Sequence, residues 1–258
     1  MGKIICLTNQ KGGVGKTTTA VNLAASLAFS GCEVLLVDCD PQGNATGGLG
    51  LEKKNIGKSL YDLLINEVSF DEVVRPTEVP HLSILPASID LVGAEIELVQ
   101  IVSRETVLSK VLAPVISRFD YIFLDCPPSL GLLTVNALTA ADAVLIPLQC
   151  EYYALEGLSQ LVQTIRLIKQ SLNPKLVVAG LVLTMFDARN NLSHQVVSEV
   201  HKHFQTKVFD TIIPRNVRLS EAPSHGKPVL LYDKYSKGTQ SYLALAREFL
   251  AREERKVI

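Results

Sequence analysis

A glycine-rich segment with two lysines lies close to the start of the chain and reads Lys11-Gly12-Gly13-Val14-Gly15-Lys16-Thr17-Thr18. The glycines allow backbone conformations that are closed to residues with a Cβ, so successive N–H groups can turn toward phosphate oxygens. Lys16 adds a positive charge for the β- and γ-phosphates, and the hydroxyl of Thr17 is a ligand that Mg²⁺ accepts. The segment therefore predicts a site for the phosphates of a nucleotide and for Mg²⁺.

Three aspartates follow two apolar runs of the type that forms buried parallel strands. Asp38 and Asp40 come after the run at 34–37, and Asp125 comes directly after the run at 121–124. Two carboxylates at such spacing point the same way, so one can serve the metal while the other orients a water molecule. An apolar strand that ends in Asp is also typical of nucleotide hydrolases, where the carboxylate holds Mg²⁺. The alternative for Asp38 is an acidic turn in which its side chain caps the following backbone.

The elements around these residues have the order that the chemistry requires. The apolar run at 4–8 predicts a strand, and the helical spacing at 18–30 predicts a helix that ends before Gly31. The positive end of that helix then faces the phosphates. The patterns further predict strands at 143–148, 176–184 and 208–213, and helices at 155–172, 192–204 and 240–252. Such alternation predicts an α/β fold with a mostly parallel, twisted sheet and helices on both faces.

Composition favours one large domain. The 258 residues are 47% apolar, and we find no linker, low-complexity run or internal repeat, so a single domain over 1–258 is expected. The net charge of −1 means that any nucleic-acid contact must come from a local patch. No pair of the five cysteines has C-x-x-C spacing, which disfavours a zinc or iron–sulfur site. Without a signal peptide or an apolar run of membrane-spanning length, we expect a cytoplasmic protein.

Blocks of residues distributed over essentially the whole chain match a known family. They lie at 9–18, 38–44, 125–131, 150–157 and 213–224. In these blocks the chain resembles the ParA/Soj-type chromosome- and plasmid-partitioning ATPases, P-loop NTPases of the deviant Walker A class, whose phosphate loop carries an extra signature lysine. The blocks at 150–157 and 213–224 are more specific than the phosphate loop. The short N-terminus resembles the Soj-like branch, which has no separate N-terminal DNA-binding domain.

The resemblance implies a role for each residue near the phosphates. Lys11 is expected to reach across a two-fold interface to the phosphates of a second subunit, and Gly12 to permit that close approach. Asp40 is expected to position the attacking water. Thr17 would be the direct Mg²⁺ ligand, with Asp38 and Asp125 on the metal side.

The resemblance also implies ATP as the nucleotide, with Met185, Pro214, Arg215 and Asn216 near its base. The alternative for Met185 is ordinary core packing.

Partners follow from the same resemblance. We expect a homodimer with ATP that binds double-stranded DNA non-specifically, associates with the nucleoid, and hydrolyses ATP when a ParB-like centromere-binding protein stimulates it. Arg189 and Arg218 are the candidate DNA contacts, because phosphate contacts need only positive charge. Possible neighbours are Lys202, Lys227, Lys234 and Lys237, for each of which a solvated surface role is the alternative.

Two other functions of related ATPases fit the residues less well. A MinD-like membrane switch needs an amphipathic C-terminal helix, whereas the segment at 243–256 mixes acidic and basic residues on its polar face, so we expect no membrane binding. An electron donor of the nitrogenase iron-protein type needs two cysteines placed to share a cluster. Cys126, directly after Asp125, has the wrong offset for that pattern.

Overall fold

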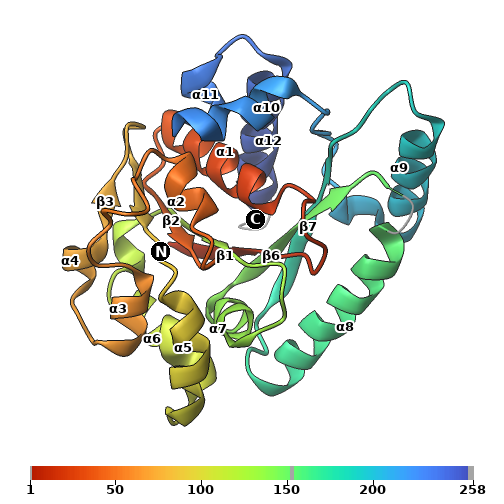
Figure 1. The fold of residues 1–258 in the computed structure, drawn as a ribbon. Coiled ribbons are helices and arrows are strands. Elements are labelled where there is room, and N and C mark those ends of the chain that lie inside the picture. The colour runs from red at the N-terminus through yellow and green to blue at the C-terminus, as the bar shows by residue number, and fades with distance from the viewer. Residues whose placement is uncertain (1, 152–153, 255–258) are drawn as a thin grey trace.

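A computed structural model describes residues 2–151 and 154–254, and its centre is a twisted sheet (Figure 1). Among these residues seven strands form the sheet, in the order β3-β4-β2-β5-β1-β6-β7. Every pairing is parallel except that of β3 with β4. The strands are β1 (Lys3–Leu7), β2 (Val34–Asp38), β3 (Arg75–Pro76), β4 (Leu82–Leu85), β5 (Tyr121–Asp125), β6 (Ala143–Gln149) and β7 (Val177–Thr184).

Helices cover both faces of the sheet (Figure 1). Residues of α1, α2, α11 and α12 share one buried apolar cluster, and those of α3, α5, α6, α7, α8 and α9 share another. Successive residues of β1 alternate between the two clusters, because side chains of a strand point to opposite faces. The α-helices are α1 (Lys16–Phe29), α2 (Asn44–Gly48), α3 (Leu60–Ile65), α4 (Phe70–Val73), α5 (Leu91–Glu97), α6 (Val107–Leu112), α7 (Leu132–Ala140), α8 (Ala154–Ser171), α9 (Asn191–Phe204), α10 (Val217–Glu221), α11 (Val229–Tyr232) and α12 (Lys237–Glu254).

The predicted fold class is confirmed, but the strand expected at 208–213 is wrong. There Val208 makes only an isolated bridge to Leu181. The N–H groups of Asp210 and Thr211 donate instead to the carboxylate of Glu248 in α12, both at 2.9 Å. This carboxylate takes two of the backbone donors that a strand would need, so regular pairing is interrupted at 210–212, while the N–H groups of Phe209 and Ile213 still donate to the carbonyls of Leu181 and Leu183 in β7.

The C-terminal helix α12 uses its apolar side inside the protein. Tyr242, Leu245 and Phe249 are buried in the cluster that contains α1, and the ring of Phe249 contacts that of Tyr121 edge-on at 5.3 Å. An apolar face occupied in this way is not offered to a bilayer. Residues 255 and 256 of the predicted C-terminal segment at 243–256 lie outside the described residues, as do Tyr152 and Tyr153 of the block at 150–157. Within the part that is described, each helix is too short or too polar to cross a membrane.

Candidate functional site

The glycine-rich loop connects β1 to α1 at the carboxyl edge of the sheet. Gly13 and Gly15 have φ angles of +75° and +86°, in the left-handed region that glycine adopts without strain. Val14 is buried, and its carbonyl accepts a hydrogen bond from the hydroxyl of Thr184 at 2.8 Å. The loop is thus fastened to the end of β7 and leads directly into the N-terminus of α1.

The ammonium group of Lys16 lies under this loop. Its Nζ donates to the carbonyl of Lys11 at 3.1 Å, and the residue is nearly buried. Burial lowers the pKa of Lys16, while the charges of Asp125 and Asp40 act in the opposite direction. A cation that is partly stripped of water interacts strongly with phosphate oxygens, so Lys16 suits the role predicted for it.

Asp125, at the end of β5, fits a metal. Both its carboxylate oxygens are buried and lack a hydrogen-bond partner among the described residues. Burial raises the pKa of Asp125 well above its ordinary value, and the charge of Asp38 adds to the rise; the nearby Thr17 hydroxyl partly offsets it without reaching hydrogen-bond geometry. A buried carboxylate without partners is costly, and a divalent cation shared with Thr17 would supply the missing charge. Asp125 and Thr17 are therefore suited to hold Mg²⁺.

Asp38 is engaged by the protein itself. Its Oδ2 accepts from the N–H of Thr46 at 2.8 Å and from the Thr46 hydroxyl at 2.7 Å, and its Oδ1 accepts from the N–H of Asp40 at 3.2 Å. The Thr46 hydroxyl in turn accepts from the N–H of Ala87 at 2.9 Å. Burial raises the pKa of Asp38 to about 6. These contacts support the capping alternative, in which Asp38 fixes the turn at 40–46, and its metal role stays a prediction.

That turn aims Asp40 at the phosphate site. The carboxylate of Asp40 accepts from the N–H of Gln42 at 2.9 Å, and the carbonyl of Asp40 accepts from Gly43 N–H at 2.8 Å. A cavity of about 430 Å³ lies between this turn and the glycine-rich loop. It is lined by Gly12, Gly13, Gly15, Lys16, Thr17, Thr18, Asp40, Gln42, Asn44, Pro128 and Met185. The cavity can hold phosphates beside a carboxylate that orients water.

A second cavity, of about 350 Å³, lies on the other side of Gly15 and suits the nucleoside. Its lining contains all four residues predicted near the base: Met185, Pro214, Arg215 and Asn216. Met185 lies directly after β7 with a φ of +52° and lines both cavities, so core packing alone does not describe it. Sequence reasoning missed other contributors from α10, from the 3₁₀ turn that follows it and from α12, namely Leu219, Ser220, Pro223 and Tyr242.

The signature lysine points away from the cavity of its own chain. The Nζ of Lys11 lies 2.8 Å from Oε2 of Glu151, and both side chains are more than a third exposed. Gly12 has no neighbour in its own chain that would exclude a side chain, since an added Cβ would meet nothing nearer than the Pro128 Cβ at 4.0 Å. No contact among the described residues therefore accounts for a glycine at this position.

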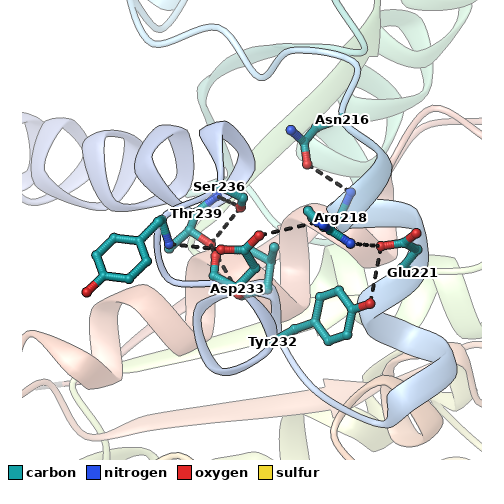
Figure 2. Close-up of polar contacts among 9 residues, drawn as sticks. Asn216, Arg218, Glu221, Tyr232, Asp233, Ser236 and Thr239 are labelled. Carbon is teal, nitrogen blue, oxygen red and sulfur yellow. Dashed lines mark hydrogen bonds and ion pairs between the residues drawn. The ribbon is translucent and has the colours of Figure 1, made fainter.

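The two arginines predicted to contact DNA are paired with carboxylates. Arg189 donates to both oxygens of Asp187, at 2.9 and 2.8 Å. Figure 2 shows Arg218 between Glu221, at 2.8 Å, and Asp233, at 3.3 Å. Both pairs are exposed and therefore screened by solvent, so either arginine can exchange its carboxylate for a phosphate.

Arg218 is also linked to the second cavity. The side chain of Asn216, which lines that cavity, accepts a hydrogen bond from the N–H of Arg218 at 3.0 Å and caps α10 (Figure 2). Among the lysines named as neighbours, Lys202 lies 3.8 Å from Glu199 and Lys227 lies 3.5 Å from Glu78. The structure thus places Arg218 next to the nucleotide cavities and Arg189 beyond β7, near α9.

Comparisons with known proteins agree with this geometry. A family model described as an AAA domain matches residues 2–178. The chain is 60% identical to the sporulation initiation inhibitor protein Soj of Bacillus subtilis (strain 168), over 97% of this chain and 99% of that protein. It is also 60% identical to the chromosome partitioning protein ParA of Myxococcus xanthus (strain DK1622), over 99% of this chain and 90% of that protein.

Solved structures share the fold, and one of them contains the expected ligands. A cobyrinic acid a,c-diamide synthase from Mycobacterium smegmatis, with bound ADP and magnesium, has a TM-score of 0.86 and 37% identity, covering 98% of this chain and 96% of that one. The cell division ATPase MinD of Pyrococcus furiosus has a TM-score of 0.81 and 25% identity, covering 97% and 99%. Proteins similar to this chain therefore include one that holds a nucleotide and magnesium in the same fold.

Proposed function

Because the chain belongs to the ParA/Soj family of chromosome-partitioning ATPases, we propose that ATP joins two copies of it into a dimer that binds duplex DNA. Hydrolysis of the ATP then separates the dimer into monomers. The chain is an ATPase that uses ATP and Mg²⁺. The nucleotide is proposed to control dimerisation and DNA binding.

The observation that carries the proposal is the pair Lys11 and Gly12. Lys11 is paired with Glu151 at the surface and lies outside the lining of the phosphate cavity of its own chain, and Gly12 leaves open space beside that cavity. A second copy that approaches Gly12 closely would bring its own Lys11 to these phosphates. There a lysine supplied by the partner would neutralise charge that develops on the transferred phosphoryl group.

The remaining roles follow from the site. Lys16 and the N–H groups of the loop bind the phosphates, while Thr17 and Asp125 hold the metal. When bound, Mg²⁺ neutralises phosphate charge and orients the terminal phosphate. Asp40, fixed by its turn, orients a water toward that phosphate and accepts its proton.

In the proposed cycle, the dimer is the form that binds DNA. Arg189 and Arg218 are exposed, and dimerisation doubles their number on one particle, which raises the number of counterions released from DNA and hence the affinity. A ParB-like protein that stimulates hydrolysis would then release the dimer from DNA. In this cycle the ATP-bound dimer would associate with the nucleoid although the net charge of the chain is only −1.

The test compares nucleotide states of the unaltered protein. Sedimentation velocity should show a monomer with ADP and a dimer with a slowly hydrolysed ATP analogue and Mg²⁺. Fluorescence anisotropy with random-sequence duplex should show tight binding in the second state alone. If the ADP form bound duplex as tightly as the ATP form, the proposed switch would be wrong.

A further inference from the structure

The segment at 89–99, which contains α5 and continues into a 3₁₀ turn at Leu98–Gln100, carries apolar side chains on two opposite sides, and one of these sides faces solvent. Leu91, Ala94 and Leu98 are fully buried in the core. A second row, which we call the α5 stripe, follows helical spacing and is exposed to between 52% and 69%. The α5 stripe consists of Ile89, Val92, Ile96 and Val99. An exposed apolar row of this length marks an interaction site more often than a solvated surface.

The α5 stripe is bordered by negative charge. The sequence has no basic residue between His81 and Arg104, whereas Asp90, Glu95 and Glu97 fall within the segment that carries the stripe. The carboxylate of Glu97 accepts from the hydroxyl of Tyr61 at 3.0 Å, and that of Asp90 accepts from the hydroxyl of Ser88 at 3.0 Å. Arg104 itself is engaged, because it donates to the carbonyl of Val99 at 3.0 Å and pairs with Glu105. A complementary surface is therefore apolar in its centre and basic at its borders.

One end of the α5 stripe reaches the turn that carries Asp40. Ile89 lines a cavity of about 400 Å³ together with Pro41 and Gln42 of that turn. Lys53 and Lys54 line the same cavity, and the Nζ of Lys53 donates to the carbonyl of Gln42 at 2.7 Å. A molecule bound at this end would touch residues adjacent to the catalytic carboxylate.

The middle of α5 reaches the loop that follows the metal ligand Asp125. A carboxylate oxygen of Glu95 occupies the space where Gly131 lacks a side chain, since a Cβ there would lie 2.0 Å from it. The same oxygen lies 3.5 Å from the N–H of Leu133 at the start of α7. Leu130 of this loop is also exposed. In Figure 1, α5 lies beside α3 and α7 at the bottom of the view.

We propose that the α5 stripe is the docking surface for a basic amphipathic helix of the regulatory partner, which lays apolar residues on the stripe and lysine or arginine against its acidic border. This rests on the proposed function in so far as the partner is the protein that stimulates hydrolysis. Contact with both loops gives the bound helix a direct route to the groups that orient water and metal. Pairing of two α5 stripes from two copies would bring like charges together, and an anionic membrane would be repelled by the same carboxylates.

The first experiment uses designed peptides as probes. One peptide of about 18 residues, long enough to form a helix, contains only leucine and lysine with the leucines on one face, and its counterpart contains leucine and glutamate. Fluorescence anisotropy should show that the leucine–lysine peptide binds and the leucine–glutamate peptide does not. The double variant Val92→Ser/Ile96→Ser should bind the first peptide about tenfold more weakly, as expected for lost apolar contacts. The matched control Leu167→Ser on α8, where the residue is 63% exposed, should bind it normally.

Charge is tested by Glu97→Lys, which should weaken binding of the leucine–lysine peptide and strengthen binding of the leucine–glutamate peptide. Equal binding of the leucine–lysine peptide to the wild type and to the double serine variant would overturn the proposal, and so would equal binding of the two peptides to the wild type. So would nucleotide-free self-association of the wild type that the serine substitutions abolish, because the occupant would then be a second copy.

The second experiment measures ATP hydrolysis with the purified ParB-like protein of the same replicon and duplex DNA. The double serine variant should keep its unstimulated rate and its ATP-dependent DNA binding but lose stimulation, while Leu167→Ser should keep all three. Stimulation of the double variant to the wild-type level would overturn the proposal. Absence of ATP-dependent DNA binding in the wild type would instead refute the proposed function, and the peptide experiment would still decide the docking surface.

Discussion

Replacing Thr46 by valine tests the reasoning about the turn that carries Asp40. The hydroxyl of Thr46 is fully buried, donates to the Asp38 carboxylate at 2.7 Å and accepts from the N–H of Ala87 at 2.9 Å. Valine has nearly the same shape, so Thr46→Val removes both hydrogen bonds without opening a cavity. The turn would then lose one of the three donors that hold Asp38.

The magnitude follows from the two lost bonds. A hydrogen bond to a charged group contributes about 1.5–3 kcal/mol, and a buried N–H left without an acceptor costs about 1–3 kcal/mol. Thr46→Val should therefore lower the free energy of unfolding by roughly 2.5–6 kcal/mol. The control Thr46→Ser keeps the hydroxyl and loses one methyl group, so it should lower that free energy by only about 1 kcal/mol.

Urea unfolding of the nucleotide-free protein, followed by circular dichroism, measures both variants. At saturating Mg²⁺ and ATP, Thr46→Val should also hydrolyse more slowly than Thr46→Ser, because Asp40 is no longer held in place. A valine variant as stable and active as the serine variant would show that the hydrogen bonds around Asp38 do not position the turn.

Four further substitutions test the site. Gly12→Val should bind ATP as a monomer, because the added side chain has room in its own chain but occupies the space of the partner, and a normal ATP-dependent dimer in sedimentation would contradict this. Asp40→Ala should bind ATP and dimerise but hydrolyse about 10² to 10⁴ times more slowly in a phosphate-release assay, and an unchanged rate would assign the water to another residue. The double variant Arg189→Ala/Arg218→Ala should dimerise normally yet lose affinity for every duplex sequence, with a salt dependence flatter by roughly one log–log unit per lost phosphate contact; undiminished binding would exclude this patch. The fold raises the pKa of Asp125, so lowering the pH adds a proton that competes with the metal. Calorimetry should therefore show that Mg²⁺-dependent ATP binding weakens as the pH falls. The variant Asp125→Asn should lose that pH dependence.

Residues that act through local geometry could be identified before the structure. The glycine-rich loop needs only its own backbone and the adjacent strand and helix, so Gly13, Gly15 and Lys16 were readable as a phosphate site from type and spacing. Unbroken apolar runs likewise predicted the central strands, because a parallel strand is buried on both faces. The runs also located Asp38 and Asp125 at strand ends.

Contacts between distant segments were decided by the tertiary structure alone. Whether Asp38 faces a metal or a hydroxyl depends on Thr46 and on Ala87, which the chain brings together from the far side of a loop. The segment at 208–213 has strand-like residues, but the carboxylate of Glu248 takes the backbone donors of Asp210 and Thr211. The local sequence pattern does not show which hydrogen-bond partner each of these groups meets in the fold.

The burial of α5 likewise depends partly on the sequence pattern and partly on the tertiary structure. The sequence shows apolar residues on both sides of this helix, a pattern typical of a helix that is buried all round. In the fold, Leu91, Ala94 and Leu98 reach the core, while the α5 stripe stays exposed. Sequence therefore determined the chemistry of the phosphate site, since each of its groups depends on near neighbours, and the packing of distant segments determined which other surfaces remain free for a partner.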